Sequence, residues 1–598
     1  MRTALRFISA LALTASLLTV APAALAAGVP INAAQFPDAV FRQYVAATYD
    51  SNSNGYLEDA ETVDVNELNV RFMHIADVTG VAHFPNVEVL WVDNNDLTSL
   101  DVSMLSHLRM LYGSNSQLSY VNIAGLAELE YASLNYSSLE SINLTGLPAL
   151  YHLDVAHSSL ASLDISELTS LQNLRAETNN ISSLTLGYLP NLTELVVSSN
   201  ELTDIDLSGV PAVENLTLSR NQLGSFQAAG FAHLRGISLD ANPLQTLELS
   251  DLPALTTISC SGCQLTELDV NGLDALTTVN VATNQLTSLD LSGLPNLNTV
   301  IAFENDFSTG EVYLPPSTRT VRMRDVGLPA FDLSGLPNLT ELNLTNSNIA
   351  SLDLAPAPGL QYLEVGGNQL DSLDLTGVPQ LLYLNVQDNH LTGIDLSNVG
   401  KLTSLYLGNI ADGDNQFAAV DLSGVPKLVV LELDRVGLES LSLEGLPALR
   451  NLSAQYNQLT ALDLSGPDWL ASVYLDGNQL TAFEPTEHLA YVSIRDNRIT
   501  SLDVTGLPLA NLFADGNHLL DVVGLVSPNP YVEIWYHFEG AGQTVTVPMH
   551  ADPDTGAYVS DAAYPITHPI TVDGASYDPD TGLFTTDHLG TAVFSTLV

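Results

Sequence analysis

Residues 50–61 place oxygen-bearing side chains at alternate positions of one short segment, D-S-N-S-N-G-Y-L-E-D-A-E. The segment matches the pattern D-x-[DN]-x-[DN]-G-x5-E at every defined position, and Gly55 allows the sharp turn that this pattern requires. Carboxylate, amide and carbonyl oxygens are the ligands that calcium prefers. The expected ligands are the side chains of Asp50, Asn52 and Asn54, the carbonyl of Tyr56, Glu58 through water, and Glu61 with both carboxylate oxygens.

This pattern is that of an EF-hand calcium loop. Before it, residues 36–49 carry Phe41, Tyr44 and Val45 at helical spacing, which predicts the entering helix. We therefore predict a small helical cap over residues 27–65 that binds calcium. The alternative is a cap that keeps an EF-hand-like shape without metal, because two direct carboxylates plus Glu58 are a modest charge for a calcium site.

Other reactive residue types give weaker signals. Cys260 and Cys263 form a C-x-x-C pair, but the two further ligands of a zinc site are missing. We expect two buried structural cysteines, with a local disulfide as the alternative. His152 and His157 are expected to face solvent. The sequence has no G-x-S-x-G, H-E-x-x-H or phosphate-cradling loop, so we predict that the chain is not an enzyme.

The charge of the chain excludes one class of partner. The 598 residues include 17 Lys and Arg against 68 Asp and Glu, which gives a formal net charge of −51. Such a surface repels the phosphates of DNA and RNA. We therefore expect no nucleic-acid binding.

The N-terminus reads as an export signal. Arg2 and Arg6 precede an apolar stretch over residues 7–20, and Ala24-Leu25-Ala26 offers a cleavage site. We predict a signal peptide over residues 1–26, no transmembrane segment after it, and no covalent wall anchor. The expected location is extracellular, secreted or held at a cell surface without a covalent link, and the expected state is monomeric.

A 21-residue repeat sets the elements that must position these residues. The unit is L-x-x-L-x-L-x-x-N-x-L, and its Asn position recurs in steps of 21 residues from Asn95 to Asn389. An insertion around Ile410–Asp414 shifts the register, which then resumes as far as Asn517. In L-x-L the leucines point inward and their neighbours outward, which is the period of a strand. The inward Asn can bond the backbone of adjacent coils, whereas Ser or Cys at this position bonds more weakly.

The repeats resemble those of internalin-type bacterial leucine-rich-repeat proteins over roughly residues 66–525. The resemblance implies a predominantly β repeat solenoid, curved, of about 22 coils, with an EF-hand-like N-terminal cap. Strand-like alternation at Val532–Tyr536 and Thr544–Val547, with turns such as Asp552–Gly556, predicts a small β-sandwich-like, immunoglobulin-like module over residues 526–598. The family implies adhesion at a surface or after secretion, with ligands on the concave face.

Aromatic and arginine side chains fall at the outward strand positions expected on that concave face. Aromatic anchors are concentrated in recognition surfaces, although aromatic residues also favour strands for their own sake. The candidate ligand-binding residues are Tyr362, Tyr383, Tyr406, Tyr474 and Tyr491 toward the C-terminus, Trp91, Tyr112 and Tyr131 toward the N-terminus, and Phe303, Arg322 and Arg324 between them.

A row of acids lies six residues after the Asn position; Asp290 is an example. Stacked carboxylates repel one another, and the expected compensation is a hydrogen bond from the backbone amides of the same turn. Cation binding along the row is the alternative.

The sequence thus favours a binding protein that recognises a protein ligand, such as a host or extracellular receptor. A glycan-binding or glycan-processing protein and a passive spacer are the alternatives.

Overall fold

A computed structural model describes residues 28–410, 414–514 and 516–519, together with the backbone of short strands between residues 521 and 596. The predicted signal peptide lies outside the described residues. The chain forms two compact units, of which unit 1 is Met1–Glu201 with Asp206–Val210 and unit 2 is Leu202–Ile205 with Pro211–Val598. Among the helices described, none is both long enough and apolar enough to cross a bilayer.

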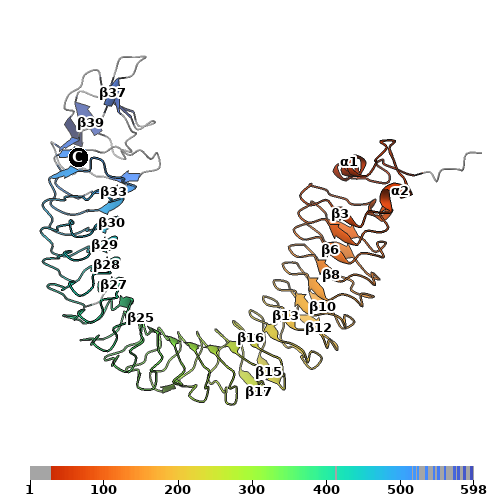
Figure 1. Cartoon of the computed structure of the whole chain (residues 1–598), viewed down its shortest axis with the longest axis horizontal. Coiled ribbons are helices and arrows are strands. Elements are labelled where there is room, and N and C mark those ends of the chain that lie inside the picture. Colours follow the sequence, from red (N-terminus) through yellow and green to blue (C-terminus); the bar gives the residue numbers. More distant parts are fainter. Residues whose placement is uncertain are drawn as a thin grey trace, which may run out of the picture. The chain divides into compact units, whose positions relative to one another are not determined.

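The helices all lie near the start of unit 1 (Figure 1). Helix α1 (Ala39–Thr48) begins where the Asp38 carboxylate accepts hydrogen bonds from the backbone N–H groups of Val40 and Phe41. Phe41 and Val45 are buried, as their helical spacing predicted. Strand β1 (Val29–Pro30) precedes α1 and pairs with β2 (Tyr56–Leu57), which follows α1. Helix α2 (Asp59–Thr62) and a 3-10 turn, η1 (Val81–His83), come next.

Each unit is built on a ladder of short parallel strands, as the L-x-L pattern predicted. In unit 1 the ladder is β3 (Glu67–Asn69), β4 (Val89–Trp91), β6 (Met110–Tyr112), β8 (Tyr131–Ser133), β9 (His152–Asp154), β11 (Asn173–Arg175) and β13 (Glu194–Val196). The middle residue of each strand pairs with the middle residue of the next, as in Leu90 with Leu111. These residues are fully buried, so each coil shares one continuous core with its neighbours.

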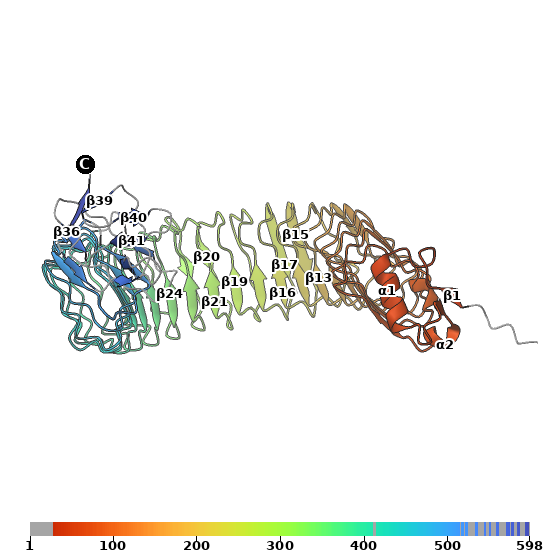
Figure 2. The same cartoon turned by 90° about the horizontal axis from the view of Figure 1, so that it is seen from above.

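Unit 2 repeats the arrangement in register (Figure 2). Its ladder is β14 (Asn215–Thr217), β16 (Gly236–Ser238), β18 (Thr257–Ser259), β19 (Thr278–Asn280), β21 (Thr299–Ile301), β23 (Thr320–Arg322), β24 (Glu341–Asn343), β25 (Tyr362–Glu364), β26 (Tyr383–Asn385), β27 (Ser404–Tyr406), β28 (Val430–Glu432), β29 (Asn451–Ser453), β30 (Ser472–Tyr474), β31 (Tyr491–Ser493), β33 (Asn511–Phe513) and β35 (Glu533–Trp535). Both units are thus predominantly β solenoids, and their described ladders have 23 strands in all, against the 22 coils expected. Between residues 90 and 517, the described residues contain no helix.

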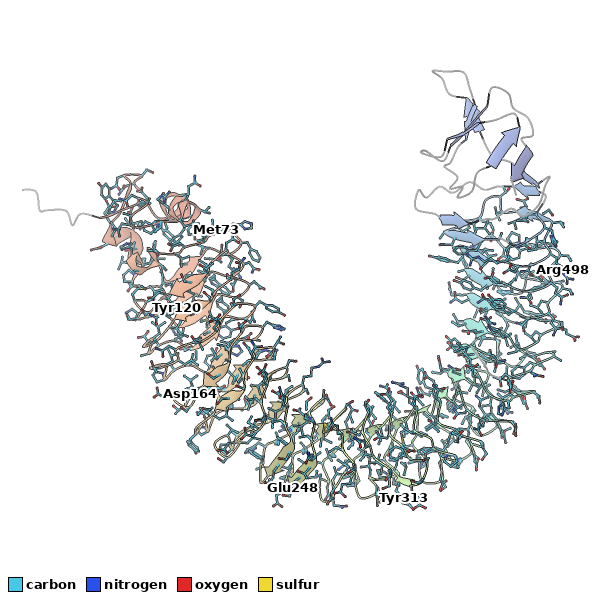
Figure 3. All side chains as sticks on the ribbon, turned by 180° about the vertical axis from the view of Figure 1, so that it is seen from behind. Met73, Tyr120, Asp164, Glu248, Tyr313 and Arg498 are labelled. Atoms are coloured by element: carbon cyan, nitrogen blue, oxygen red, sulfur yellow. A yellow bond between two sulfur atoms is a disulfide. The ribbon has the colours of Figure 1, made fainter. Side chains whose placement is uncertain are left out.

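A second, shorter row of parallel strands lies outside the ladder. In unit 1 it comprises β5 (Ser99–Asp101), β7 (Tyr120–Asn122), β10 (Ser162–Asp164) and β12 (Ser183–Thr185). In unit 2 it comprises β15 (Ser225–Ala229), β17 (Thr246–Ser250), β20 (Leu289–Asp290), β22 (Val312–Tyr313), β32 (Ser501–Asp503), β34 (Asp521–Val523) and β36 (Gln543–Val545). Tyr120, Asp164, Glu248 and Tyr313 belong to this row (Figure 3).

The inward Asn of the repeat ties consecutive coils together. The Asn389 amide donates to the carbonyls of Val365 and Val386 at 2.9 and 3.0 Å and accepts from the backbone N–H of Leu370 at 3.0 Å. This confirms the role predicted for the position. Serine serves it less well, because the buried hydroxyls of Ser116, Ser137 and Ser158 find no protein partner, although that of Ser347 donates to the Met323 carbonyl at 2.9 Å.

The end of the chain forms two small sheets. In the first, β36 pairs with β42 (Val593–Thr596), which pairs with β39 (Ile570–Asp573). The second contains β37 (Met549–Ala551), β38 (Tyr558–Ser560), β41 (Leu583–Thr586) and β40 (Ser576–Asp578). The predicted turn at Asp552–Gly556 lies outside the described residues, and a sandwich-like module over residues 526–598 stays a prediction.

Candidate ligand-binding face and calcium loop

The outward side chains of the ladder strands, with those of the residue two places further on, form what we call the ladder face of each unit. It carries every residue predicted for ligand binding. The leucines between them, such as Leu363 and Leu384, are fully buried. By contrast, Tyr362, Tyr474 and Tyr491 are exposed to 47%, 38% and 45%, and the others are half-buried or exposed. These aromatic and arginine side chains are therefore outside the core.

Three tyrosines on consecutive strands of unit 2 form one strip, which we call the tyrosine strip. The ring centroids of Tyr362 and Tyr383 lie 6.3 Å apart and those of Tyr383 and Tyr406 lie 5.3 Å apart. The rings are tilted by 31° and 38°, so they touch without covering each other's faces. Burial, with the negative charge of Glu364 nearby, raises the pKa of Tyr383 to about 12. Tyr474 and Tyr491 lie further along the same ladder on β30 and β31.

Carboxylates that the sequence analysis did not single out lie beside the tyrosine strip. Glu364, Glu432 and Asp434 are half-buried on the same face. Burial raises the pKa of all three, and a neighbouring carboxylate adds to the effect at Glu364 and Glu432. The register could have found them, since Glu364 and Glu432 hold the third position of their ladder strands, as Tyr406 does, and Asp434 lies two residues further on.

The predicted cluster around Phe303 is already paired within the chain. The Arg324 guanidinium lies 4.5 Å from the centre of the Phe303 ring and bonds Glu304 and Asp325 at 3.1 and 2.6 Å. Arg322 bonds Glu341 at 2.6 Å. The charges of both arginines are thus matched by carboxylates of the same face.

In unit 1 the predicted aromatics form a continuous column. Trp91 stacks on Tyr112 with centroids 3.7 Å apart, Tyr112 lies 5.0 Å from Tyr131, and Tyr131 stacks on His152 at 4.4 Å. Arg71 extends the column, since its guanidinium lies 4.3 Å from the Trp91 ring. Arg71 was not among the predicted residues, although its position two residues after β3 places it on the ladder face.

Bulky side chains also occupy the edge of the ladder face at strained backbone positions. The residue before the inward Asn has a positive φ in coil after coil, and Asn, Asp or Gly is common there. Tyr136 and His157 adopt it with φ of 52° each, a conformation unfavourable for large residues. Their rings stack at 4.2 Å. In unit 2, Arg435 and Tyr456 occupy this same backbone position, and the Arg435 guanidinium lies 4.0 Å from the centre of the Tyr456 ring.

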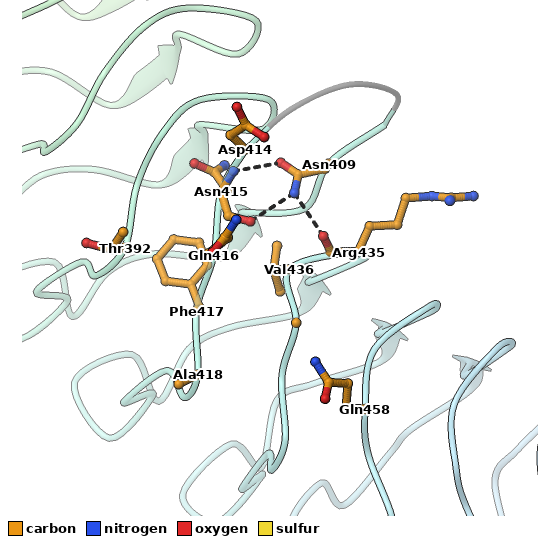
Figure 4. Close-up of a pocket in the computed structure, with 11 residues that line it drawn as sticks. Thr392, Asn409, Asp414, Asn415, Gln416, Phe417, Ala418, Arg435, Val436 and Gln458 are labelled. Atoms are coloured by element: carbon orange, nitrogen blue, oxygen red, sulfur yellow. Dashed lines mark hydrogen bonds between the residues drawn. The ribbon is translucent and has the colours of Figure 1, made fainter.

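The insertion in unit 2 is held by one asparagine. The Asn409 amide donates to the carbonyls of Asn415 and Arg435, each at 2.9 Å, and accepts from the backbone N–H of Asn415 at 3.2 Å (Figure 4). These bonds return the chain to the repeat register after the extra residues. A pocket of about 510 Å3, lined in part by Phe417, lies beside this point. Its lining includes Asn409 and Asp414, and we assign it no function.

The loop over residues 50–61 has the backbone of the predicted calcium loop. The Asp50 carboxylate accepts from the backbone N–H groups of Asn54 and Gly55 at 3.0 and 2.9 Å. Gly55 has φ of 81°, which only glycine adopts without strain. Tyr56 and Leu57 then form β2, which pairs with β1. The expected turn and entering helix are both present.

The predicted calcium ligands are partly brought together. The amides of Asn52 and Asn54 donate to the Glu58 carboxylate at 3.1 and 2.6 Å, so these three side chains meet. Glu61 instead accepts from the hydroxyl and backbone N–H of Ser51 at 2.7 and 2.8 Å. Although partial burial raises it, these hydrogen bonds and those from Glu58 hold the pKa of Glu61 at about 2.

The donor set of this loop is mixed. Within the described part of the chain, no group of three or more His, Cys, Asp and Glu side chains is arranged to hold a metal ion. Calcium in this loop would therefore depend on amide and carbonyl oxygens beside the carboxylates, which is the kind of donor set that calcium accepts.

The structure also bears on the cysteine pair and on the row of acids. Cys260 and Cys263 are fully buried, as expected, and they form the local disulfide that was the alternative to two structural thiols. The expectation for the acid row is confirmed at residues such as Asp290, whose carboxylate accepts from the backbone N–H and hydroxyl of Ser292 at 3.0 and 2.7 Å. These bonds lower the pKa of Asp290, so its charge is stabilised within its own turn.

Comparison with known proteins identifies the fold. Neither a family model nor a curated protein sequence matches this chain. The solved structure of YopM from Yersinia enterocolitica WA-314 is similar over 83% of this chain and 99% of that one, with a TM-score of 0.60 and 22% identity. The functional domain of InlJ from Listeria monocytogenes matches 96% of this chain and 97% of its own, with a TM-score of 0.49 and 20% identity. The chain has the leucine-rich-repeat solenoid fold, as its repeats predicted, and this conclusion rests on its own coils and on YopM.

Proposed function

We propose that this chain is an exported binding protein that recognises a protein ligand on its ladder face. The observation that carries the proposal is the tyrosine strip, in which Tyr362, Tyr383 and Tyr406 touch across three strands while their rings stay outside the core. A passive spacer has no use for such a strip, because exposed aromatic rings promote aggregation. Export is inferred from the signal-like N-terminus.

The geometry of the unit 1 column favours protein over glycan as its ligand. A sugar ring binds by lying flat on an open aromatic face. In unit 1, Trp91 and Tyr112 are parallel to within 7°, and Tyr131 and His152 to within 3°, so each pair covers a face of both of its rings. What remains open includes ring edges and phenol hydroxyls, which suit the side chains and backbone of a protein.

The test compares two triple variants on arrays of extracellular proteins and of glycans. We expect the wild-type chain to bind one or more proteins, and Tyr362→Ala/Tyr383→Ala/Tyr406→Ala to bind them at least about tenfold more weakly. The control variant, Tyr120→Ala/Tyr188→Ala/Tyr313→Ala, removes three exposed tyrosines that lie off the ladder strands and should bind as the wild type does. Binding to glycans alone, or unchanged protein binding by the strip variant, would overturn the proposal.

The melting temperature of the strip variant distinguishes a structural role. We expect it to match that of the control, because the three rings lie outside the core. If the strip variant unfolds, the tyrosines are structural and the proposal loses its main support.

We also propose that the loop over residues 50–61 binds calcium. Its support is the turn at Gly55, the closure of the loop by Asp50, and the meeting of Asn52, Asn54 and Glu58. Asp50, Asn52, Asn54, the Tyr56 carbonyl, Glu58 and Glu61 would hold the ion. Calcium would replace the internal hydrogen bonds of these side chains and tie α1 to α2.

Hydrogen exchange at residues 39–62 tests the calcium proposal in the full chain. Calcium added to metal-free protein should slow exchange in α1 and α2 and raise the temperature at which they unfold. Glu61→Gln should abolish the response. Asp59→Asn, which removes an exposed carboxylate at a non-ligand position of the same helix, should keep it. Identical exchange with calcium and with EDTA would show that the loop is a metal-free cap.

A further inference from the structure

The tyrosine strip lies in a part of the ladder face that has negative charge and no positive charge. The outward positions of β25 to β28, with the residue two places after each strand, are Tyr362, Glu364, Gly366, Tyr383, Asn385, Gln387, Ser404, Tyr406, Gly408, Val430, Glu432 and Asp434. They include three carboxylates and neither Lys nor Arg.

Glu364 and Glu432 accept their side-chain hydrogen bonds from neutral amides. The Asn343 amide donates to Glu364, and the Gln387 amide donates to Glu432 at 2.7 Å. In the described chain neither carboxylate forms an ion pair with Lys, Arg or His. Both are half-buried, and each is near another carboxylate. The positive charge of Arg322 acts on Glu364 only from beyond ion-pair distance, because Arg322 pairs with Glu341. A partly desolvated carboxylate that lacks a direct ion pair is unfavourable, and a cation brought close would offset that cost.

The two carboxylates lie on either side of two tyrosines. Glu364 is on β25 and Glu432 is on β28, while Tyr383 and Tyr406 are on the two strands between them. The negative charges of both carboxylates act on both tyrosine hydroxyls. Aromatic faces attract cations, and carboxylates bind guanidinium and ammonium groups, so the two kinds of side chain suit the same ligand.

Elsewhere on the ladder face this chain supplies such cations itself. Arg324 lies over Phe303 and bonds Glu304, and Arg435 lies over Tyr456. In each case a guanidinium from one coil covers an aromatic ring of the adjoining coil. The tyrosine strip has the rings and the carboxylates of this arrangement but not the cation.

We infer that the tyrosine strip with Glu364 and Glu432 is a docking surface for a basic segment of the partner protein. Arg or Lys side chains of the partner lie against the rings of Tyr383 and Tyr406 and pair with Glu364 and Glu432, one at each carboxylate. The inference rests on the proposed function and adds the chemistry of the ligand. The net charge of −51 draws basic segments to the chain, and the strip provides the place where they are held.

A peptide selection on the immobilised full chain tests this inference. Peptides from a random linear library are selected on the wild type, and those that also bind the Tyr362→Ala/Tyr383→Ala/Tyr406→Ala variant are discarded. We expect the remaining peptides to be rich in Arg and Lys. Fluorescence anisotropy should show them binding Glu364→Gln/Glu432→Gln about tenfold more weakly than the wild type.

A matched variant separates local recognition from general attraction. Glu267→Gln/Glu439→Gln removes the same charge from exposed glutamates outside the ladder strands, and should bind the peptides within about twofold of the wild type. Replacing the peptide's arginines by citrulline should also abolish binding, which tests the charge without altering the protein.

The outcomes distinguish the inference from the proposed function. Peptides that need the tyrosines but carry no basic residue, or that bind the Glu364→Gln/Glu432→Gln variant and the wild type equally, overturn the inference and leave the proposed function in place. An equal loss in both glutamate variants also overturns it, because attraction would then be general. If no selected peptide depends on the tyrosines, the proposed function fails at this strip and the inference fails with it.

Discussion

The indole of Trp91 lies parallel to the phenol ring of Tyr112, with centroids 3.7 Å apart and planes 7° apart. The Arg71 guanidinium lies 4.3 Å from the same indole and comes from the coil on the other side. Trp91 is therefore enclosed between two neighbouring coils, although it projects outward from its strand. Part of the unit 1 column therefore stabilises the fold, although it lies at the surface.

Tyr112→Ala should lower the stability of unit 1. The substitution uncovers one face of the indole and removes a stacking contact, so we expect a loss of about 1–2 kcal/mol. Urea unfolding measures the loss, and the tryptophan emission of the folded protein should shift to the red. Tyr120→Ala, at an exposed position on β7, should leave both unchanged. Equal stability of the two variants would show that the stacking of Trp91 on Tyr112 does not stabilise unit 1.

Asparagine and serine at the inward position should differ sharply in their contribution to stability. Asn389→Ala leaves the carbonyls of Val365 and Val386 and the N–H of Leu370 without their partner, and should cost about 2–3 kcal/mol. Ser116→Ala removes a buried hydroxyl that has no protein partner, so stability should stay constant or rise. The urea-unfolding midpoint of each variant, compared with that of the wild type, measures the change in stability. A large loss for Ser116→Ala would indicate that a bound water completes its hydrogen bonds.

The two cysteines should be oxidised in the exported protein. We expect no alkylation when the chain is unfolded without reductant, and two alkylated thiols after reduction, as measured by mass spectrometry of the peptide containing Cys260 and Cys263. Because both residues are fully buried, reduction in the folded state should be slow. Two thiols reactive without reductant would contradict the disulfide.

The contribution of Glu61 to stability should disappear in acid. Hydrogen bonds to its carboxylate lower its pKa from 4.5 to about 2 in the folded chain. Its contribution is therefore fully present above about pH 4.5 and is lost as the pH falls toward 2. In metal-free protein, Glu61→Gln should lower the unfolding temperature of residues 39–62 at pH 7, and the difference from the wild type should shrink between pH 4.5 and 2. A difference independent of pH would mean that the carboxylate charge has no part in it.

The sequence alone determined the architecture of this protein, because that architecture is local and repeated. The alternation in L-x-L decided which side of each strand is buried, and the 21-residue step placed equivalent residues on adjacent strands, as for Leu363 and Leu384. The role of Asn389 and the turn around Asp290 also followed from short-range geometry. Each of these predictions depended on neighbours within one coil or on the same position of the next.

The tertiary structure decided what the outward side chains do, because their rotamers and their neighbours in adjacent coils are not encoded in any one repeat. The repeat placed Trp91 and Tyr112 in one column but did not determine that they stack face to face. It placed Tyr383 and Tyr406 one column apart, yet only the structure showed them in contact, beside two carboxylates that form no ion pair among the described residues. The sulfurs of Cys260 and Cys263 bond because the coil brings both side chains inward to one point of the core, and C-x-x-C spacing alone leaves that bond undecided.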